Sequence, residues 1–420
     1  MSAIELTISH IGSGGDGIAT HRGKTYYIPF TAPGERISAN VDDAKGDGNV
    51  CTIVEIIEES TERVKPSCRH FGLCGGCAMQ HLSPDFTAEW KRQRILDCLE
   101  RAGITDAHVL PTVTSPSGSR RRVEFIASKR KKGVMIGFHL RRSHQIFDIG
   151  DCPVIAPALL ALVKPLRSLL PELLPRNSEA RLLATETENG VDLLITAELT
   201  MDLDKREMLS AFAAEQSLAR IAWRARPQDT PETIAARLPA EVRLGGIPTL
   251  LPPGSFLQAT NAGEEALGAF AVNALRDAKR IVDLFAGVGS FTLPLSALAP
   301  VHGVEGDAEL VKGLQMAANR AIRPVTTECR DLFQRPLLKD ELNAFDGLLF
   351  DPPRAGAKAQ ALEIAKSDIP VVVAISCNPV TFARDITLLL DGGYQLCPLQ
   401  PVDQFLFSPH VEMAALLTRA

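Results

Sequence analysis

Hydrophobic and polar positions follow different patterns in different parts of the 420-residue chain. In residues 3–57, short stretches with apolar residues at every second position are separated by glycine-rich turns, which predicts half-buried strands. Strands this short and evenly spaced favour a small closed barrel. Such a barrel is either a binding module or a structural cap, and the pattern leaves both roles open.

The middle of the chain predicts a mixture of helices and strands. A helix is expected over residues 85–101, where apolar positions recur at helical spacing. Paired strands are expected in residues 120–150, around the basic turn 129–132. Residues 157–250 combine helical and strand patterns without a motif that indicates a function.

From Asn261 onward, helical segments alternate with continuous apolar runs. Asn261 and Glu264 predict a capping box for a helix that ends near Leu275. Strands are expected over residues 280–285, 300–305, 325–329, 345–350, 370–376 and about 410–418. This alternation is typical of a doubly wound α/β sheet, which binds ligands beyond the carboxyl ends of its parallel strands.

The three patterns predict three domains. These are a β-barrel in residues 1–60, a central α+β domain in residues 61–255 and a doubly wound α/β domain in residues 256–420. The length of the chain fits two or three domains. No stretch resembles a signal peptide or a membrane span, so we expect a cytoplasmic monomer with no membrane partner.

Charge is unevenly distributed along the chain. The net charge is −5, yet nine Lys or Arg residues and one acidic residue, Glu124, lie between Arg120 and Arg142. The net charge alone would argue against a nucleic-acid partner. The basic segment favours contact with phosphates, although the usual place of such a segment is a solvated hairpin face.

A glycine-rich turn follows the first predicted strand of the last domain, in Ile-Val-Asp-Leu-Phe-Ala-Gly-Val-Gly-Ser-Phe-Thr, residues 281–292. A dinucleotide fingerprint would need a third glycine where Thr292 stands, and Asp283 would repel a pyrophosphate. Asp283 suits a cofactor with a cationic tail, Glu305 can accept from ribose hydroxyls and Asp331 can meet an adenine edge. Together these carboxylates indicate S-adenosylmethionine, against the alternative of an ordinary strand–turn–helix.

Two further strand ends carry candidates for chemistry. Cys377 ends the apolar run 371–376, where it is either a nucleophile or a buried structural cysteine. A thiolate that adds to carbon 6 of a uracil makes carbon 5 nucleophilic, and Glu412 is the candidate base for the proton on carbon 5. A surface glutamate on an edge strand is the alternative for Glu412. Asp351 is held in Asp-Pro-Pro-Arg, and Arg354 in place of an aromatic argues against methylation of amino groups.

These motifs resemble those of the S-adenosylmethionine-dependent RNA uridine-5-methyltransferases, and more narrowly of the members that act on 23S ribosomal RNA. The resemblance covers nearly the whole chain and includes Cys-Arg-His-Phe-Gly-Leu-Cys-Gly-Gly-Cys at residues 68–77 and Ser-Phe-Leu-Gln-Ala-Thr-Asn at residues 255–261. It implies an N-terminal, OB-like TRAM barrel that binds RNA, with Cys377 as nucleophile and Glu412 as base. The implied ligands of a 4Fe-4S cluster are Cys68, Cys74, Cys77 and Cys152. The implied cofactor-binding residues are Gln258, Phe285, Ser290, Glu305, Asp331 and Asp351.

The chain departs from the pattern of this family at two places. Ser290 stands where relatives often have Asn, which predicts slightly weaker cofactor binding. Residues 404–410 lack the usual Phe-Pro-x-Thr run, which leaves the setting of Glu412 open. The residues that stack on a flipped base are not identified either.

Several alternatives remain for the activity. The transfer-RNA branch of the family generally lacks the cysteine cluster and the barrel, so ribosomal RNA is favoured over a transfer-RNA uridine. A radical enzyme would need C-x3-C-x2-C, whereas this chain has C-x5-C-x2-C and a fourth cysteine. A non-catalytic ribosome-assembly factor is the third alternative, and intact Cys377 and Glu412 argue against it.

Overall fold

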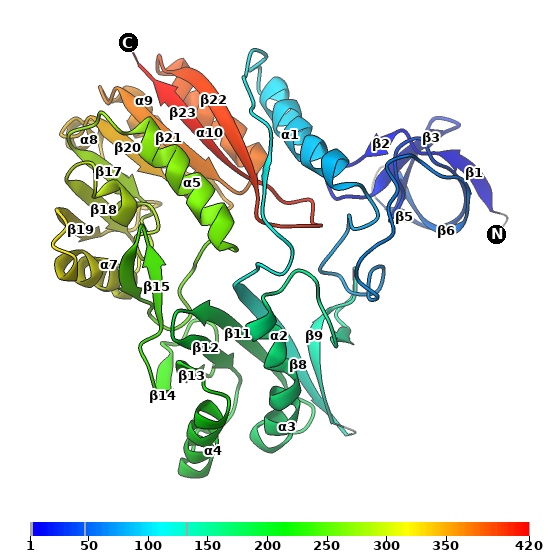
Figure 1. Ribbon diagram of the computed structural model, residues 1–420. Coiled ribbons are helices and arrows are strands. Elements are labelled where there is room, and N and C mark those ends of the chain that lie inside the picture. Colours follow the sequence, from blue (N-terminus) through cyan, green and yellow to red (C-terminus); the bar gives the residue numbers. More distant parts are fainter. Residues whose placement is uncertain (1–2, 46–47, 132, 420) are drawn as a thin grey trace.

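The structure is a computed structural model that describes residues 3–45, 48–131 and 133–419. Lys132, in the predicted basic turn, lies outside the described residues. In the described part, the strands form sheets of six, seven, two and eight strands (Figure 1). None of the helices within these ranges is both long enough and apolar enough to cross a membrane.

The N-terminal sheet is curled (Figure 1) and has the strand order β1-β5-β6-β4-β3-β2. Its strands are β1 (Ile4–Thr7), β2 (His10–Ile11), β3 (Gly17–His21), β4 (Lys24–Ile28), β5 (Arg36–Lys45) and β6 (Gly48–Glu58). The edge strands β1 and β2 are separated by Ile8 and Ser9 alone, so one bent segment pairs with both sides of the sheet. At this bend Ile8 exchanges backbone hydrogen bonds with Gly34 and Glu35, and the Ser9 N–H donates to the Ile18 carbonyl. The sheet is therefore curled, and its complete closure into a barrel stays a prediction.

The central sheet has the order β10-β9-β8-β11-β12-β13-β14. Its strands are β8 (Arg122–Arg130), β9 (Gly133–His139), β10 (Ile146–Asp148), β11 (Glu179–Thr187), β12 (Gly190–Thr196), β13 (Arg220–Arg224) and β14 (Glu232–Ala236). Helices α2 (Pro157–Ala161), α3 (Val163–Leu173) and α4 (Leu203–Glu215) contribute to the core under this sheet. A hairpin, β15 (Glu241–Leu244) and β16 (Ile247–Leu250), leads to the C-terminal unit.

The C-terminal sheet has the order β19-β18-β17-β20-β21-β23-β22-β7, and β23 runs antiparallel to both of its neighbours. Its strands are β17 (Ile281–Leu284), β18 (Val301–Glu305), β19 (Val325–Cys329), β20 (Gly347–Phe350), β21 (Val371–Ser376), β22 (Gln395–Asp403), β23 (Glu412–Thr418) and β7 (Val113–Thr114). Its helices are α5 (Asn261–Ala274), α6 (Thr292–Leu295), α7 (Ala308–Arg320), α8 (Lys339–Leu342), α9 (Lys358–Lys366) and α10 (Pro379–Asp391). All six predicted strands are present, and β22 and β7 were not predicted.

The start of α5 differs from the predicted capping box. Thr260 is the N-cap, and its hydroxyl accepts a hydrogen bond from the Gly263 N–H at 3.0 Å. The side chains of Asn261 and Glu264 accept hydrogen bonds from Arg121 of the central unit instead. A long-range cation has therefore replaced the local partner that the sequence predicted.

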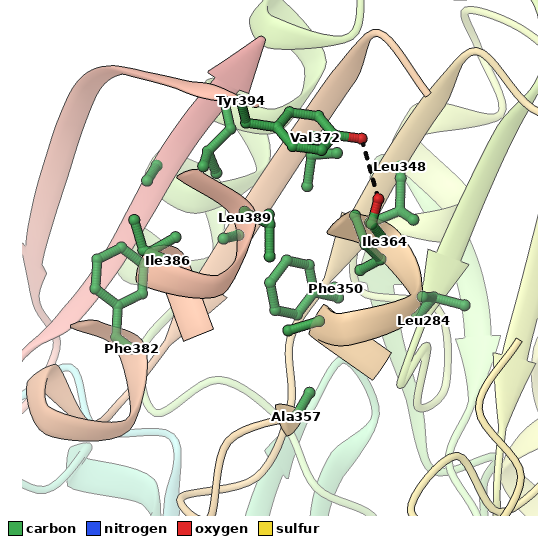
Figure 2. Packing of buried hydrophobic residues seen from close by; sticks show 14 of the residues in the cluster. Leu284, Leu348, Phe350, Ala357, Ile364, Val372, Phe382, Ile386, Leu389 and Tyr394 are labelled. Atoms are coloured by element: carbon green, nitrogen blue, oxygen red, sulfur yellow. Dashed lines mark hydrogen bonds between the residues drawn. The ribbon is translucent and has the colours of Figure 1, made fainter. Parts of the chain in front are cut away.

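One core cluster joins the C-terminal sheet to the helices that cover it. Figure 2 shows Phe350 of β20, Ile364 of α9 and Leu389 of α10 packed together with Tyr394. The Tyr394 hydroxyl donates to the Ile364 carbonyl at 3.5 Å (Figure 2), so this buried ring also has a polar partner. The cluster fixes the spacing of the strands whose ends carry the candidate residues.

Helix α1 (Pro84–Arg101) belongs to the same core, although it comes early in the chain. Ser83 caps it by accepting from the Phe86 N–H at 3.2 Å, and Ile95 and Leu99 are fully buried. Strand β7 then pairs in parallel with β22. The three predicted domain ranges stay predictions. Helix α1 and strand β7 lie inside the second range, yet α1 packs into the core of the last sheet and β7 forms the edge strand of that sheet.

Candidate active site

The candidate residues of the last unit gather at one edge of its sheet. Strands β17, β18, β20 and β21 are parallel, so Asp351 and Cys377 follow strands that end at the same edge. Strand β23 is antiparallel, and Ser376 of β21 faces Met413. Glu412, the first residue of β23, therefore lies at this edge beside Cys377.

A chain of amide side chains joins two buried carboxyl groups. The Gln258 Nε2 donates to Asp351 Oδ2 at 3.2 Å, and the Gln404 Nε2 donates to Gln258 Oε1 at 2.5 Å. The Gln404 Oε1 accepts from the Ala259 N–H at 2.8 Å, and its side chain lies near enough to Glu412 to lower the pKa of that carboxyl group. Asp351, Gln258, Gln404 and Glu412 form what we call the carboxyl–amide chain.

Burial is the main cause of the pKa shifts of the two carboxyl groups in the carboxyl–amide chain. Burial raises the pKa of Glu412, and the neighbouring charge of Asp351 raises it further. Burial also raises the pKa of Asp351, against its hydrogen bond from Gln258. A carboxyl group whose pKa is raised toward neutrality can accept a proton during catalysis and release it to solvent afterwards.

The Cys377 thiol is held in its neutral form by the same surroundings. Burial raises its pKa to about 11, with further contributions from Glu412 and Asp351, while Arg354 opposes the shift. Arg354 is fixed by a 3.0 Å contact between its Nη2 and the Nδ1 of His410. Because a thiol must lose its proton to act as a nucleophile, the nearby carboxylates are suitable acceptors.

Asp283 has an unsatisfied oxygen in the interior. Its Oδ2 accepts from the Thr292 hydroxyl at 2.5 Å, while its Oδ1 has no hydrogen-bond partner among the described residues. Burial raises the pKa of Asp283 to about 7, and Asp351 and Glu305 add to the shift. A buried carboxyl oxygen without a donor fits a cationic ligand group, such as the ammonium of S-adenosylmethionine.

Glu305 lies in a set of backbone donors. Its Oε2 accepts from the Gly287 N–H at 3.0 Å, and its Oε1 accepts from Gly306 at 2.7 Å and Asp307 at 3.0 Å. These bonds link the end of β18 to the glycine-rich turn after β17. They fix the orientation of the Glu305 carboxylate, whose role toward a ribose stays a prediction.

The turn after β17 has a backbone suited to close approach by a ligand. Phe285 has φ 64°, which is left-handed, and its ring lies 5.5 Å from that of Phe333. At Gly289 a Cβ atom would lie 2.5 Å from Leu314, so only glycine fits. The Asp331 Oδ1 accepts from the Phe333 N–H at 2.9 Å, which places Asp331 beside these two rings.

Ser290 lies apart from the carboxyl–amide chain. Its hydroxyl donates to Glu264 Oε2 at 3.3 Å, and Arg121 binds the same Glu264 oxygen at 2.7 Å. Ser290, Arg121 and Glu264 line a polar cavity of about 870 Å³ between the central sheet and α5. The structure thus connects Ser290 to the domain junction, and its role toward a cofactor stays a prediction.

The four cysteines of the predicted cluster line one cavity of about 430 Å³. Burial raises the pKa of Cys74, Cys77 and Cys152. The N–H groups of His70 and Gly76 approach the Sγ atoms of Cys68 and Cys74 at 3.4 and 3.5 Å. These donors suit sulfur atoms that carry negative charge when they bind a metal group.

The structure does not by itself identify a metal group in this cavity. In the ranges that the structure describes, no three or more His, Cys, Asp or Glu side chains are grouped closely enough to hold a metal ion. The assignment of these four cysteines to a cluster therefore stays a prediction.

Much of the predicted basic segment is engaged inside the protein. Arg121 pairs with Glu264, and Arg141 and Arg142 both bind Asp16 of the N-terminal sheet, with 2.6 Å between Arg142 and Asp16. Arg122 donates to the Ser255 carbonyl and Lys129 to the Leu174 carbonyl, while Arg130 pairs with Glu179 at the surface. The contacts of Arg121, Arg141 and Arg142 join the central unit to its two neighbours, which the sequence did not predict. Contact of the basic segment with phosphates stays a prediction.

Gln404 is the functional candidate that sequence reasoning missed. It is 2% exposed, donates to Gln258 and lies near Glu412, although it belongs to the stretch that departs from the family pattern. A glutamine after a strand carries no sequence signature. Only the meeting of three distant segments reveals its position.

Comparison with known proteins gives consistent likenesses. Residues 308–420 match the family model described as tRNA (Uracil-5-)-methyltransferase. An uncharacterized RNA methyltransferase of Brucella melitensis is 42% identical over 417 residues, which cover 99% of this chain and 98% of the relative. The 23S rRNA (uracil(1939)-C(5))-methyltransferase RlmD of Halomonas elongata is 35% identical over 436 residues, covering 98% of this chain and 89% of the relative.

The fold has a counterpart of the same extent among solved structures. The tRNA (uracil-54, C5)-methyltransferase of Pyrococcus abyssi, solved with S-adenosyl-L-homocysteine, matches with a TM-score of 0.78 and 24% identity over 99% of both chains. This match supports the arrangement of sheets described above. With the likeness to the Brucella and Halomonas proteins over nearly the entire chain, it shows that the chain belongs to the RNA (uracil-5-)-methyltransferase family.

Proposed function

We propose that the protein methylates carbon 5 of a uridine in 23S ribosomal RNA through a covalent bond between Cys377 and carbon 6 of the base. S-adenosylmethionine supplies the methyl group when it is bound. The observation that carries the proposal is the position of Cys377 beside the carboxyl–amide chain, whose buried Glu412 has a raised pKa. A nucleophile and a base with tuned proton affinity are the two groups that this reaction needs.

The two residues act at different stages. The Cys377 thiolate adds to carbon 6 and makes carbon 5 electron-rich. Once carbon 5 carries the methyl group, Glu412 accepts the remaining proton from that carbon. The electron pair of the C–H bond re-forms the double bond between carbons 5 and 6, the C–S bond breaks, and Cys377 leaves as a thiolate. Burial supports the proton transfer, because a desolvated carboxylate is a stronger base than an exposed one.

The cofactor would bind along the ends of β17 to β20. Asp283 offers its unpaired oxygen to the ammonium group, and Glu305 accepts from the ribose. The rings of Phe285 and Phe333 and the Asp331 carboxylate would meet the adenine. Gln258, Asp351 and Ser290 complete the proposed set, with the first two joined by their hydrogen bond.

We further propose that Cys68, Cys74, Cys77 and Cys152 hold a 4Fe-4S cluster with a structural role. The cavity that they line and the N–H donors beside their sulfur atoms support this assignment. The N-terminal sheet would act as a TRAM-like RNA-binding module in residues 1–60. Protein purified without oxygen should be brown and contain iron. Folded, active and colourless protein without iron would overturn the cluster.

Ribosomal RNA is the proposed target because of the named activity of the Halomonas relative. A transfer-RNA uridine is the second candidate, since the Pyrococcus protein of the same fold carries that name. Mapping of 5-methyluridine in both RNAs from a strain that lacks the protein separates the two. We expect loss of a site in 23S RNA, restored by the wild-type protein but not by Cys377→Ala. Loss confined to transfer RNA would reassign the target, and no loss in either RNA would favour a binding factor.

A further inference from the structure

Helix α1 contains a lysine that is completely buried. The Lys91 side chain is 0% exposed, and its Nζ lies 2.5 Å from Asp403 Oδ1, whose side chain is 2% exposed. The same Nζ donates to the Phe405 carbonyl at 3.2 Å. Lysine is almost never fully buried unless it is paired, and a buried pair is weak support for stability in itself. The position of this pair indicates another use.

Lys91 binds the start of the segment that ends at the candidate base. We call residues 404–411, which join β22 to β23, the base loop, because Glu412 follows it directly. Asp403 Oδ1 also accepts from the Phe405 N–H at 3.0 Å. One carboxylate thus joins the lysine of α1 to the backbone of the base loop.

The rest of the base loop is held from the same side. Arg94, one turn after Lys91 on α1, donates to the Pro409 carbonyl. The N–H groups of Ala78 and Met79 donate to the Phe407 carbonyl at 2.9 and 3.0 Å. Phe407 has φ 62°, a left-handed conformation that residues other than glycine rarely adopt unless their surroundings impose it.

Gln404 carries this fixation to the reacting groups. It lies between Asp403, which binds Lys91, and Phe405, whose carbonyl binds Lys91. Its side chain donates to Gln258 at 2.5 Å, and Val402, the residue before Asp403, pairs with Glu412 across β22 and β23. A shift of the backbone at residues 403–405 would therefore displace both Gln404 and the strand pairing that positions Glu412.

We infer that Lys91 is a positioning residue, which holds Glu412 in place through Asp403 and Gln404. The inference rests on the proposed function, in which Glu412 removes the proton from carbon 5. A directional ion pair fixes the register between α1 and β22 more narrowly than apolar contact does. Without it, addition of Cys377 and methyl transfer proceed, while proton removal slows because the base is misplaced.

The test replaces the pair by neutral groups of similar size, in Lys91→Met/Asp403→Asn. Both charges disappear together, so neither is left buried without a partner. We expect a methylated, covalent protein–RNA adduct to accumulate on denaturing gels with methyl-labelled cofactor. A misplacement of the base by about 1 Å slows the release step on the order of 100-fold. Binding of S-adenosylhomocysteine should change little, since Lys91 and Asp403 touch no proposed cofactor residue directly and Gln258 keeps its hydrogen bond to Asp351.

A matched control removes a second buried ion pair, far along the chain from the base loop. Arg220 and Asp192 of the central sheet lie 2.6 Å apart, with side-chain exposures of 11% and 5%. The variant Asp192→Asn/Arg220→Met should lose stability without accumulating adduct. A purely structural role of Lys91 predicts the same behaviour for both double variants.

Two further variants make failure informative. Glu412→Gln must trap the methylated adduct; if it does not, the proposed function fails before Lys91 is tested. If it does, and folded Lys91→Met/Asp403→Asn releases product at the wild-type rate, the positioning role is overturned. Should the double variant not fold, Gln404→Met interrupts the connection without touching the ion pair. Adduct accumulation in Gln404→Met supports the connection, and wild-type release overturns it.

Discussion

The carboxyl groups at the two halves of one sheet edge have different hydrogen-bond partners. At the end of β18, both oxygens of Glu305 accept backbone N–H groups from Gly287, Gly306 and Asp307. At the ends of β20 and β23, Asp351 and Glu412 meet side-chain amides, and burial raises the pKa of both. Backbone donors fix the orientation of the Glu305 carboxylate, whereas burial brings Asp351 and Glu412 toward the range in which a carboxyl group exchanges protons.

The local sequence explains why backbone N–H groups are available in one half and not in the other. In the glycine-rich turn at residues 285–289, three residues have positive φ angles, and the Gly287 N–H donates to Glu305. After β20, Pro352 and Pro353 have no N–H to offer, so Asp351 depends on Gln258. One sheet edge can therefore hold a ligand on one side and carry out proton transfer on the other, and four experiments test this division.

The largest effect is expected for Cys377→Ala, which removes the nucleophile. No covalent bond to RNA can form, so methyl transfer should be undetectable in an assay with methyl-labelled cofactor. Cofactor binding, which belongs to the other half, should persist. A labelled adduct of wild-type strength would mean another nucleophile, with Cys329 and Cys397 as the nearest alternatives.

Glu412→Gln should reduce turnover on the order of 10²–10⁴-fold, because general-base catalysis is lost. Unlike Cys377→Ala, it should accumulate a protein–RNA adduct that carries the new methyl group, visible as a shifted, labelled band. If Glu412→Gln turns over at the wild-type rate, another residue must be the base, and Asp351 is the next candidate.

Glu305→Ala tests the binding half. Loss of a charge-assisted hydrogen bond to ribose should weaken cofactor affinity by about 1–3 kcal/mol in calorimetry, while RNA binding barely changes. Glu309→Ala is the matched control, since Glu309 is exposed on α7 and pairs only loosely with Lys312 at 4.0 Å. Equal affinities for both variants would remove Glu305 from the cofactor site.

The smallest effect is one of stability. The pKa of Glu412 is raised in the folded protein from 4.5 to about 8, so the folded state holds a proton that the unfolded state has released in this range. Stability should therefore fall as pH rises from about 4.5 toward 8. Glu412→Gln resembles the protonated form, so it should be more stable than the wild type at pH 8, by about 1.4 kcal/mol for each unit by which folding raises the pKa of Glu412, with little difference at pH 4. Thermal unfolding at both pH values measures this, and a gap that shrinks with rising pH would contradict it.

Sequence reasoning was most successful where the chain is simplest. The strands of the doubly wound sheet were predicted because buried strands are continuous apolar runs. Strand β22 was missed because Pro398, Pro401 and several polar residues interrupt its pattern, and its pairing with β23 shifts register between Leu396 and Leu399. Edge pairing with β7 depends on a partner far away in the chain.

The sequence could predict individual candidate residues, but not the hydrogen bonds that connect them. Cys377 could be named because it ends a buried apolar run, and Glu412 because it lies on the last predicted strand, at about residues 410–418. The catalytic roles of both residues stay predictions. The carboxyl–amide chain could not be predicted, since Gln258, Asp351 and Gln404 lie on separate segments. Lys91 illustrates the same limit, because a lysine in a helix predicts a solvent-facing side chain, and only its meeting with Asp403 reverses this expectation.

The contacts between α1 and the last strands also determine the order in which the protein can fold. Lys91 and its partner Phe405 are 314 residues apart, and the core that encloses Ile95 and Leu99 is built largely from residues near the end of the chain. During translation, helix α1 leaves the ribosome long before its partners exist, so its apolar face and its lysine stay in contact with water or a chaperone. Closing a loop of this length is slow, and the active site becomes competent only when the last strand is released.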